Sequence, residues 1–348
     1  MVSLEAKKIP FYITIFILIL IITTFGNKLK EIFYIQDQED EYTLIRKYLL
    51  NDDIINGNNK PKLWIHSKYE TNSRVWKSFY SRNSTDLNQP YIHLTVKTII
   101  DHCGDDFNIC LIDDDSFSKL IPSWNYQIHL LPENMKSSIR EYGMTTLLFI
   151  YGGIIVPNSF LCMKNLKEFY DLALIQKKPF IVENINHTSN VIKDRKRMLF
   201  LPNTFFMGSL KKDPIIQELL EYQKIQTYIP HISSQSTFLG ETNHFCLELV
   251  KQKKMTLIGG EIIGIKTSKQ KTILLEELME ENFLDLHSKC YGIYIPQEDI
   301  LKRIKYKWFA SSSSKDIFES NSIISTYLKA SIVDVKEKQI VSSNINQF

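Results

Sequence analysis

Residues 139–166 read IREYGMTTLLFIYGGIIVPNSFLCMKNL, and this stretch decides the fold. Apolar side chains at positions 142, 144 and 147–150 recur at the spacing of a helix that is buried along one side. The pair Gly152 and Gly153 supplies the backbone freedom that ends such a helix. The apolar run 154–156 then predicts a short buried strand, which Pro157 ends. The stretch therefore predicts a helix, a tight corner and an inner parallel strand.

A helix, the triplet Tyr151-Gly152-Gly153, an apolar strand and a short polar triplet follow one another here. This arrangement resembles the DXD-containing glycosyltransferase family, to which yeast mannosyltransferases belong, and the related capsular polysaccharide synthesis proteins. The resemblance implies an α/β fold of the GT-A type, in which a mostly parallel sheet is flanked by helices. It also implies transfer of a sugar from a nucleotide sugar to a glycan or protein acceptor.

The residues that carry the metal chemistry of this family are different in this chain. When the glycine pairs are matched, the Asp-X-Asp triplet of the family falls on Pro157, Asn158 and Ser159. The helix Asp of the family falls on Glu141, and its Arg falls on Met144. Mn or Mg beside a diphosphate prefers anionic oxygen ligands, whereas Asn158 and Ser159 offer neutral oxygens. The sequence therefore disfavours a metal cofactor and predicts at most a weak metal site at these two residues.

Other candidate site residues follow from the resemblance. The candidate cofactor-binding residues are His66, Lys68, Tyr151, Gly152, Gly153, Asn158 and Ser159, and the candidate catalytic acids are Glu141, Glu241 and Glu261. His66 follows a predicted strand, 62–66, that leads to the nucleotide-binding loop in the related families. A single histidine at a strand end is more often structural. No spacing selects between Glu241 and Glu261 as an acid on the acceptor side.

Two charged runs allow more than one interpretation. Asp113-Asp114-Asp115 follows a predicted strand and is either the acidic cap of a helix or a displaced metal site. Residues 302–309 interleave lysine and arginine with aromatic side chains. They are either a clamp for a diphosphate or a base, or a cationic amphipathic segment on the surface. We further expect a substrate-side loop over 131–136 and a charged helix over 276–286.

The N-terminal part of the chain predicts attachment to a membrane. Residues 9–25 contain 17 residues without a charge, which favours a transmembrane signal-anchor over 9–26, with a cleaved signal peptide as the alternative. Lysines flank this segment on both sides, so the charges leave its orientation open. The resemblance implies a single-pass protein of type II whose domain lies in the lumen of a Golgi-like, ER-like or viral membrane.

The domain organisation follows from this segment and from composition. We expect a short tail over 1–8, a stem over 27–60, a GT-A-like domain over 61–334 and a mobile tail over 335–348. A net charge of +3, from 42 basic and 39 acidic residues in 348, gives no electrostatic footprint for nucleic acid. Five cysteines define no disulfide framework.

Two functions remain open from the sequence. The first is a membrane-anchored glycosyltransferase that uses a nucleotide sugar. The second is a catalytically inactive GT-A-like domain that acts as a membrane-tethered structural or carbohydrate-binding module. The lost carboxylates favour the second function, and the intact surroundings of the motif favour the first.

Overall fold

The computed structural model describes residues 60–67, 89–186, 198–228 and 235–332. The chain divides into two compact units, Met1–Lys47 and Tyr48–Phe348, and every described residue belongs to the second. The predicted anchor, the stem up to residue 59, Lys68 and the C-terminal tail lie outside the described residues. Within these ranges, no helix is both long enough and apolar enough to cross a membrane.

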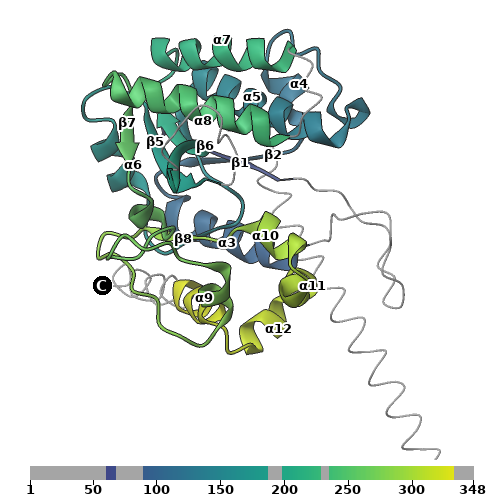
Figure 1. Cartoon of the computed structure of the whole chain (residues 1–348), viewed down its shortest axis with the longest axis vertical. Coiled ribbons are helices and arrows are strands. Elements are labelled where there is room, and N and C mark those ends of the chain that lie inside the picture. Colours follow the sequence, from purple (N-terminus) through teal and green to yellow (C-terminus); the bar gives the residue numbers. More distant parts are fainter. Residues whose placement is uncertain (1–59, 68–88, 187–197, 229–234, 333–348) are drawn as a thin grey trace, which may run out of the picture. The chain divides into compact units, whose positions relative to one another are not determined.

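A six-stranded sheet with the order β2-β1-β3-β6-β5-β7 forms the centre of the second unit (Figure 1). β1 pairs in parallel with β2 and β3, and β5 pairs in parallel with β7. β6 lies between β3 and β5 and is antiparallel to both. The prediction of a mostly parallel sheet is confirmed, with one reversed strand that was not predicted. The strands are β1 Lys62–His66, β2 Asn108–Ile112, β3 Gly153–Ile155, β5 Phe180–Ile185, β6 Phe200–Ser209 and β7 Thr256–Ile258.

Helices cover both faces of this sheet (Figure 1). α5, α7 and α8 pack against one another on one face, and α3 lies on the other face beside a two-stranded antiparallel sheet of β4 and β8. The longer helices are α3 Pro90–Cys103, α5 Glu133–Tyr151, α7 Pro214–Tyr228 and α8 Gln235–Lys251. The shorter elements are α4 Ser116–Leu120, η1 Ile128–Leu130, β4 Phe160–Cys162, α6 Lys167–Ala173, η2 Gly260–Ile263, α9 Leu275–Met279, β8 Gly292–Tyr294, α10 Gln297–Lys302, η3 Ile304–Tyr306, α11 Lys307–Ser311 and α12 Ser314–Glu319.

The corner between α5 and β3 forms as predicted. Gly152 and Gly153 have φ angles of 71° and 105°, a region that side chains disfavour. The indole Nε1 of Trp64 in β1 donates a hydrogen bond of 2.9 Å to the carbonyl oxygen of Gly152. β3 therefore enters the sheet at a fixed position beside β1 as an inner strand.

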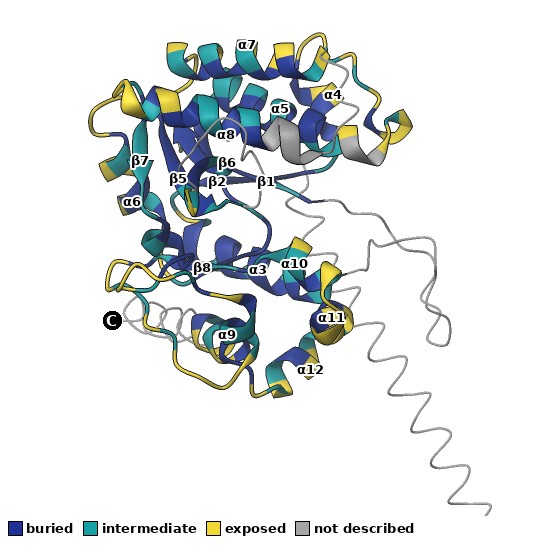
Figure 2. Ribbon diagram, in the orientation of Figure 1, coloured by how far each residue is buried: buried dark blue, intermediate teal, exposed yellow. Residues whose placement is uncertain are grey.

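Two apolar clusters hold the layers together, and Figure 2 shows most of the strand residues and the inner helix faces as buried, with β7 intermediate. One cluster joins the sheet to α5, α7 and α8 and includes Trp64 and Met144. The other joins α3 to the C-terminal helices and includes Tyr91 and Phe309, whose ring centroids are 4.9 Å apart. All five cysteines lie within the described ranges, and each is free and buried.

Two local predictions were wrong. The charged segment 276–286 was expected to be one helix, but α9 ends at Met279, and Phe283 is 95% exposed. Leu278, Met279, Phe283 and Leu286 recur at helical spacing, so the local apolar pattern does not explain why the helix ends at Met279. Residues 131–136 were expected to be a loop, whereas α5 already begins at Glu133, directly after Pro132. Proline is common at the start of a helix, where its missing N–H group costs nothing.

Candidate functional site at the carboxyl edge of the sheet

Five of the six strands in the central sheet end at the same edge. β1, β2, β3, β5 and β7 share one direction because β6 alone is antiparallel to its neighbours. β1 lies between β2 and β3, so the connection from β1 to β2 and the connection from β2 to β3 run in opposite directions along the sheet. Open α/β sheets bind their ligands outside the carboxyl ends of the strands at such a switch point. The segments that follow β1, β2 and β3 therefore form the candidate site.

Three charged or titratable side chains meet at this edge. Arg140 of α5 donates from Nε and Nη2 to the two carboxylate oxygens of Asp114, at 2.8 and 2.6 Å. His66 Nε2, at the end of β1, lies 3.0 Å from Asp114 Oδ1, and its ring stacks on Phe117. A bidentate pair fixes the guanidinium plane as well as its position. The Asp114 carboxylate therefore fixes the orientation of both Arg140 and His66.

The electrostatics of this group follow from its burial and its charges. Burial by itself raises the pKa of Asp114, but hydrogen bonds from Arg140 and His66 outweigh it and hold this pKa well below its usual range. Arg140 is only 8% exposed, and its Nη1 has no hydrogen-bond partner within the described residues. A buried guanidinium nitrogen without a partner is costly, so this atom lacks an acceptor within the described residues.

The three consecutive aspartates, 113–115, make different contacts. The carboxylate of Asp113 accepts hydrogen bonds from Ser116 N at 2.9 Å and Ser116 Oγ at 2.6 Å, so it caps α4. Asp114 belongs to the group with Arg140, and Asp115 is exposed. The described parts of the chain hold no group of three or more His, Cys, Asp or Glu residues that could bind a metal. The cap interpretation is therefore correct for Asp113 and incomplete for Asp114.

The triplet after β3 lies beside this group. Asn158 is 9% exposed, and its Nδ2 lies 3.5 Å from Ser67 Oγ, directly after β1. Ser159 is fully buried, and its Oγ has no partner among the described residues. One amide and one buried hydroxyl, with no carboxylate, do not fit Mn or Mg, which require several oxygen ligands with anionic character. We therefore derive no step through a metal at Asn158 and Ser159.

The family resemblance did not anticipate the role of Arg140. Met144, at the position of the family's arginine, is 8% exposed and belongs to the apolar core. Arg140 lies one helical turn earlier, and residues at i and i+4 share a helix face. The sequence does contain an arginine, Arg140, four residues before Met144. Only the contact between Arg140 and Asp114 in the structure identifies it as a candidate site residue.

The predicted acid Glu141 makes its contacts in the layer of helices and not with Arg140. Its Oε1 accepts hydrogen bonds from Thr204 of β6 and, at 3.3 Å, from Gln223 of α7. Burial raises the pKa of Glu141 from 4.5 to about 7, although both hydrogen bonds favour the charged form. The described contacts therefore bring Glu141 to β6 and α7 and not to the group around Asp114.

The other two predicted acids lie in different places. Glu241 of α8 accepts a hydrogen bond of 3.2 Å from Tyr222 Oη. Glu261 follows β7 directly after Gly259 and Gly260, at the same edge as His66, and its Oε2 has no partner among the described residues. Glu261 follows a strand at the carboxyl edge of the sheet, whereas Glu241 lies on α8.

A buried ion pair supports the backbone beside Glu261. The Glu183 carboxylate in β5 accepts a hydrogen bond from Lys266 and another, at 3.2 Å, from the backbone N–H of Gly260. The Lys266 ammonium also lies 4.2 Å from the centre of the Phe200 ring. These contacts fix the turn that carries Glu261.

Three predicted cofactor-binding residues lie at the opposite end of β3. Tyr151 Oη donates to the carbonyl oxygen of Leu120 at 2.8 Å, and its ring packs against Trp64. Gly153 lies against the backbone of Lys62, at the start of β1. The described contacts of Tyr151, Gly152 and Gly153 shape the corner, so their cofactor-binding role stays a prediction.

Comparison with known proteins gives matches among solved structures. No known family's sequence profile and no curated protein matches the chain. A solved structure entitled "PaToxG Glycosyltransferase" is 12% identical over 64% of this chain and 83% of that chain. Its TM-score is 0.28, and at this value the similarity carries no argument about residues or activity. The architecture itself is a mostly parallel central sheet with flanking helices.

We expect Asp114→Ala to lower the free energy of unfolding by about 1 to 2 kcal/mol at pH 7, because it leaves Arg140 buried without a counter-ion. The Asp114 side chain is 29% exposed, so solvent screens part of the effect. Because the pKa of Asp114 is depressed, its contribution is present above about pH 4 and is lost as the pH falls further.

Urea unfolding followed by circular dichroism measures this loss. The matched control is Asp115→Ala in the exposed neighbour, for which we expect a change below about 0.5 kcal/mol. Equal effects of the two substitutions would show that the pair with Arg140 does not contribute to stability.

Proposed function

We propose that this chain is a glycosyltransferase-like protein that binds a nucleotide sugar at the carboxyl edge of β1, β2 and β3. One observation carries the proposal: His66, Asp114 and Arg140 converge there from three separate segments, beside the switch point of the sheet. The resemblance of residues 139–166 to DXD-containing glycosyltransferases supplies the ligand class. The convergence of these three side chains supports this edge as the place for that ligand.

Each side chain has a definite task in this proposal. Arg140 is held by Asp114 through Nε and Nη2, so Nη1 remains to donate to an anionic oxygen of the nucleotide. A fixed guanidinium can offset diphosphate charge that a metal offsets in other enzymes. Asp114 and His66 position the guanidinium and present polar groups to the ribose or the base. Ligand binding here therefore does not depend on Mn.

Transfer of the sugar requires a group that accepts the proton of the acceptor hydroxyl. Glu261 follows β7 at the carboxyl ends of the strands, four strands along the sheet from β1, and has a carboxylate oxygen without a protein partner within the described residues. We assign the base to Glu261, with a glycan or protein hydroxyl as the acceptor. The apolar segment 9–25 supports attachment to a membrane, and its flanking lysines leave the orientation of the domain open.

A second function, an inactive carbohydrate-binding or structural module, is favoured by one specific observation. The positions of the family's arginine and metal ligands are held by Met144 in the apolar core and by Asn158 and Ser159, which carry no charge. In that case nucleotide or glycan binding would occur without release of a nucleoside diphosphate.

Calorimetry on the full-length protein in detergent tests the proposal. UDP- and GDP-sugars are titrated with Mn and with a chelator, and we expect one of them to bind with similar affinity in both buffers. Arg140→Gln should weaken that binding by about 10- to 100-fold, because a charge-assisted hydrogen bond is lost.

The matched control is Arg303→Gln, since Arg303 is exposed and pairs with Glu276 on the surface. The thermal midpoints of both variants check that the fold is intact. Tight Mn-dependent binding that Asn158→Ala abolishes would contradict the proposal. Release of nucleoside diphosphate in the presence of an acceptor glycan, and its loss in Glu261→Gln, separates the transferase from the inactive module.

A further inference from the structure

The segment from the end of α10 to α11 has an unusual surface. Residues 302–308 read KRIKYKW. Tyr306 and the following Phe309 are buried, and Phe309 packs on Tyr91 of α3. Ile304 is 86% exposed and Trp308 is 43% exposed, and Figure 2 shows exposed residues along this segment. The buried rings anchor the segment, so Ile304 and Trp308 are presented outward on a fixed base.

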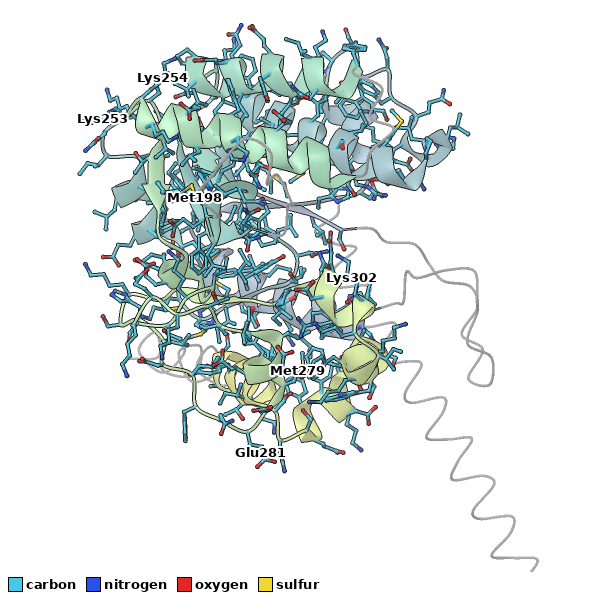
Figure 3. All side chains as sticks on the ribbon, in the orientation of Figure 1. Met198, Lys253, Lys254, Met279, Glu281 and Lys302 are labelled. Atoms are coloured by element: carbon cyan, nitrogen blue, oxygen red, sulfur yellow. The ribbon has the colours of Figure 1, made fainter. Side chains whose placement is uncertain are left out.

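Cationic side chains surround these two apolar residues. Lys302, labelled in Figure 3, ends α10 and is 3.6 Å from Glu298, and Arg303 pairs with Glu276. Lys305 lies over the ring of Tyr306, with its ammonium 5.1 Å from the ring centre. Lys305 and Lys307 form no ion pair within the described residues. The surface of residues 302–308 therefore combines exposed apolar side chains with cations that no carboxylate neutralises within the described part of the chain.

We propose that residues 302–308 form a contact surface for a membrane with anionic lipid headgroups. An isoleucine and a tryptophan between lysines match the interface of a bilayer, where apolar groups enter the acyl boundary and lysines meet headgroup phosphates. A nucleic acid or an acidic protein would use the lysines but leaves Ile304 in water. The apolar segment 9–25 of the same chain supports a nearby bilayer.

The expected strength of this contact is modest. Each lysine near an anionic surface contributes about fivefold in affinity, so Lys305 and Lys307 together contribute about 25-fold. A gain in affinity of about 25-fold is too small to hold a soluble protein on a membrane by itself. It is sufficient to orient a domain that is already tethered to the membrane. The surface would then set how the domain lies against the bilayer. The inference does not depend on nucleotide binding at Arg140.

The test uses the full-length protein in lipid nanodiscs. All five native cysteines are buried, so Ile304→Cys gives one accessible thiol for an environment-sensitive fluorophore. We expect a blue shift and at least about twofold quenching by nitroxide-labelled lipid in phosphatidylcholine discs that contain phosphatidylserine. In discs of phosphatidylcholine alone, both signals should be much smaller. Adding Lys305→Glu and Lys307→Glu to Ile304→Cys should remove them.

The matched control is Ile225→Cys on α7, because Ile225 is also an isoleucine and is 60% exposed. A label there should respond to neither lipid. Equal quenching at positions 304 and 225, or equal signals with and without phosphatidylserine, would overturn the proposal. Nucleotide-sugar binding by the same labelled protein is measured in parallel, so failure of one proposal is distinguishable from failure of the other.

Discussion

Gly153→Ala is expected to lower the free energy of unfolding by about 4 kcal/mol, the largest effect of any single substitution considered. A Cβ atom at this position would lie 2.1 Å from the carbonyl oxygen of Lys62, which is backbone in the adjacent strand. The φ angle of 105° adds strain for any residue with a side chain. Relief would require β3 to move away from β1, which breaks the pairing of Leu63 with Ile154.

Denaturant unfolding of the purified variant measures this effect. Gly260→Ala is the matched control. A Cβ atom at position 260 would chiefly meet the Ile265 side chain, at 3.2 Å, and Gly260 does not have a positive φ angle. We expect the control to lose less than about 1 kcal/mol. A Gly153→Ala variant with the stability of the control would show that the corner between α5 and β3 tolerates a side chain at position 153.

Glu141→Gln is expected to stabilise the protein by about 2 to 3 kcal/mol at pH 8. Burial raises the pKa of Glu141 from 4.5 to about 7, so the folded state holds the proton more tightly than the unfolded state does. The contribution of this carboxyl to stability is therefore full below about pH 4.5 and is lost as the pH rises through 7.

The amide that Glu141→Gln introduces meets suitable partners. Its oxygen can accept from Thr204 and Gln223 as the carboxylate does, and its NH₂ group can donate to Gln223 Oε1, which has no partner within the described residues. Free energies of unfolding between about pH 4 and pH 8 test the expectation. The wild type should lose stability over this range more steeply than Glu141→Gln does.

The control for this prediction is Glu248→Gln on α8, because Glu248 is exposed and pairs with Lys251 at the surface. Its pH profile should follow that of the wild type. Identical profiles for Glu141→Gln and the wild type would mean that Glu141 is solvated and titrates as an ordinary glutamate.

The structure also limits how the family's motif could be restored. Ser159 is fully buried and Met144 is 8% exposed, so Ser159→Asp and Met144→Arg would both place charges inside the protein. An isolated buried charge is costly unless a partner meets it. Building Mn dependence into this site therefore requires more than the three family residues at positions 144, 157 and 159.

The sequence by itself determined the local elements. The apolar spacing in α5, the glycine pair at 152–153 and the short apolar run after it fix a helix, a corner and a strand, because each depends on side chains within a few residues. The same holds for α3, whose apolar residues recur at helical spacing between Pro90 and Cys103. The expectation of a mostly parallel sheet follows from the alternation of strands and helices.

Only the tertiary structure decided the site and the reversed strand. Asp114 is 26 residues from Arg140 and 48 residues from His66, so no local pattern links them. The direction of β6 depends on its neighbours β3 and β5, and not on its own sequence. Short-range preferences determine whether a segment forms a helix or a strand. The order of the strands and the contacts between distant charged residues depend on long-range packing of the core.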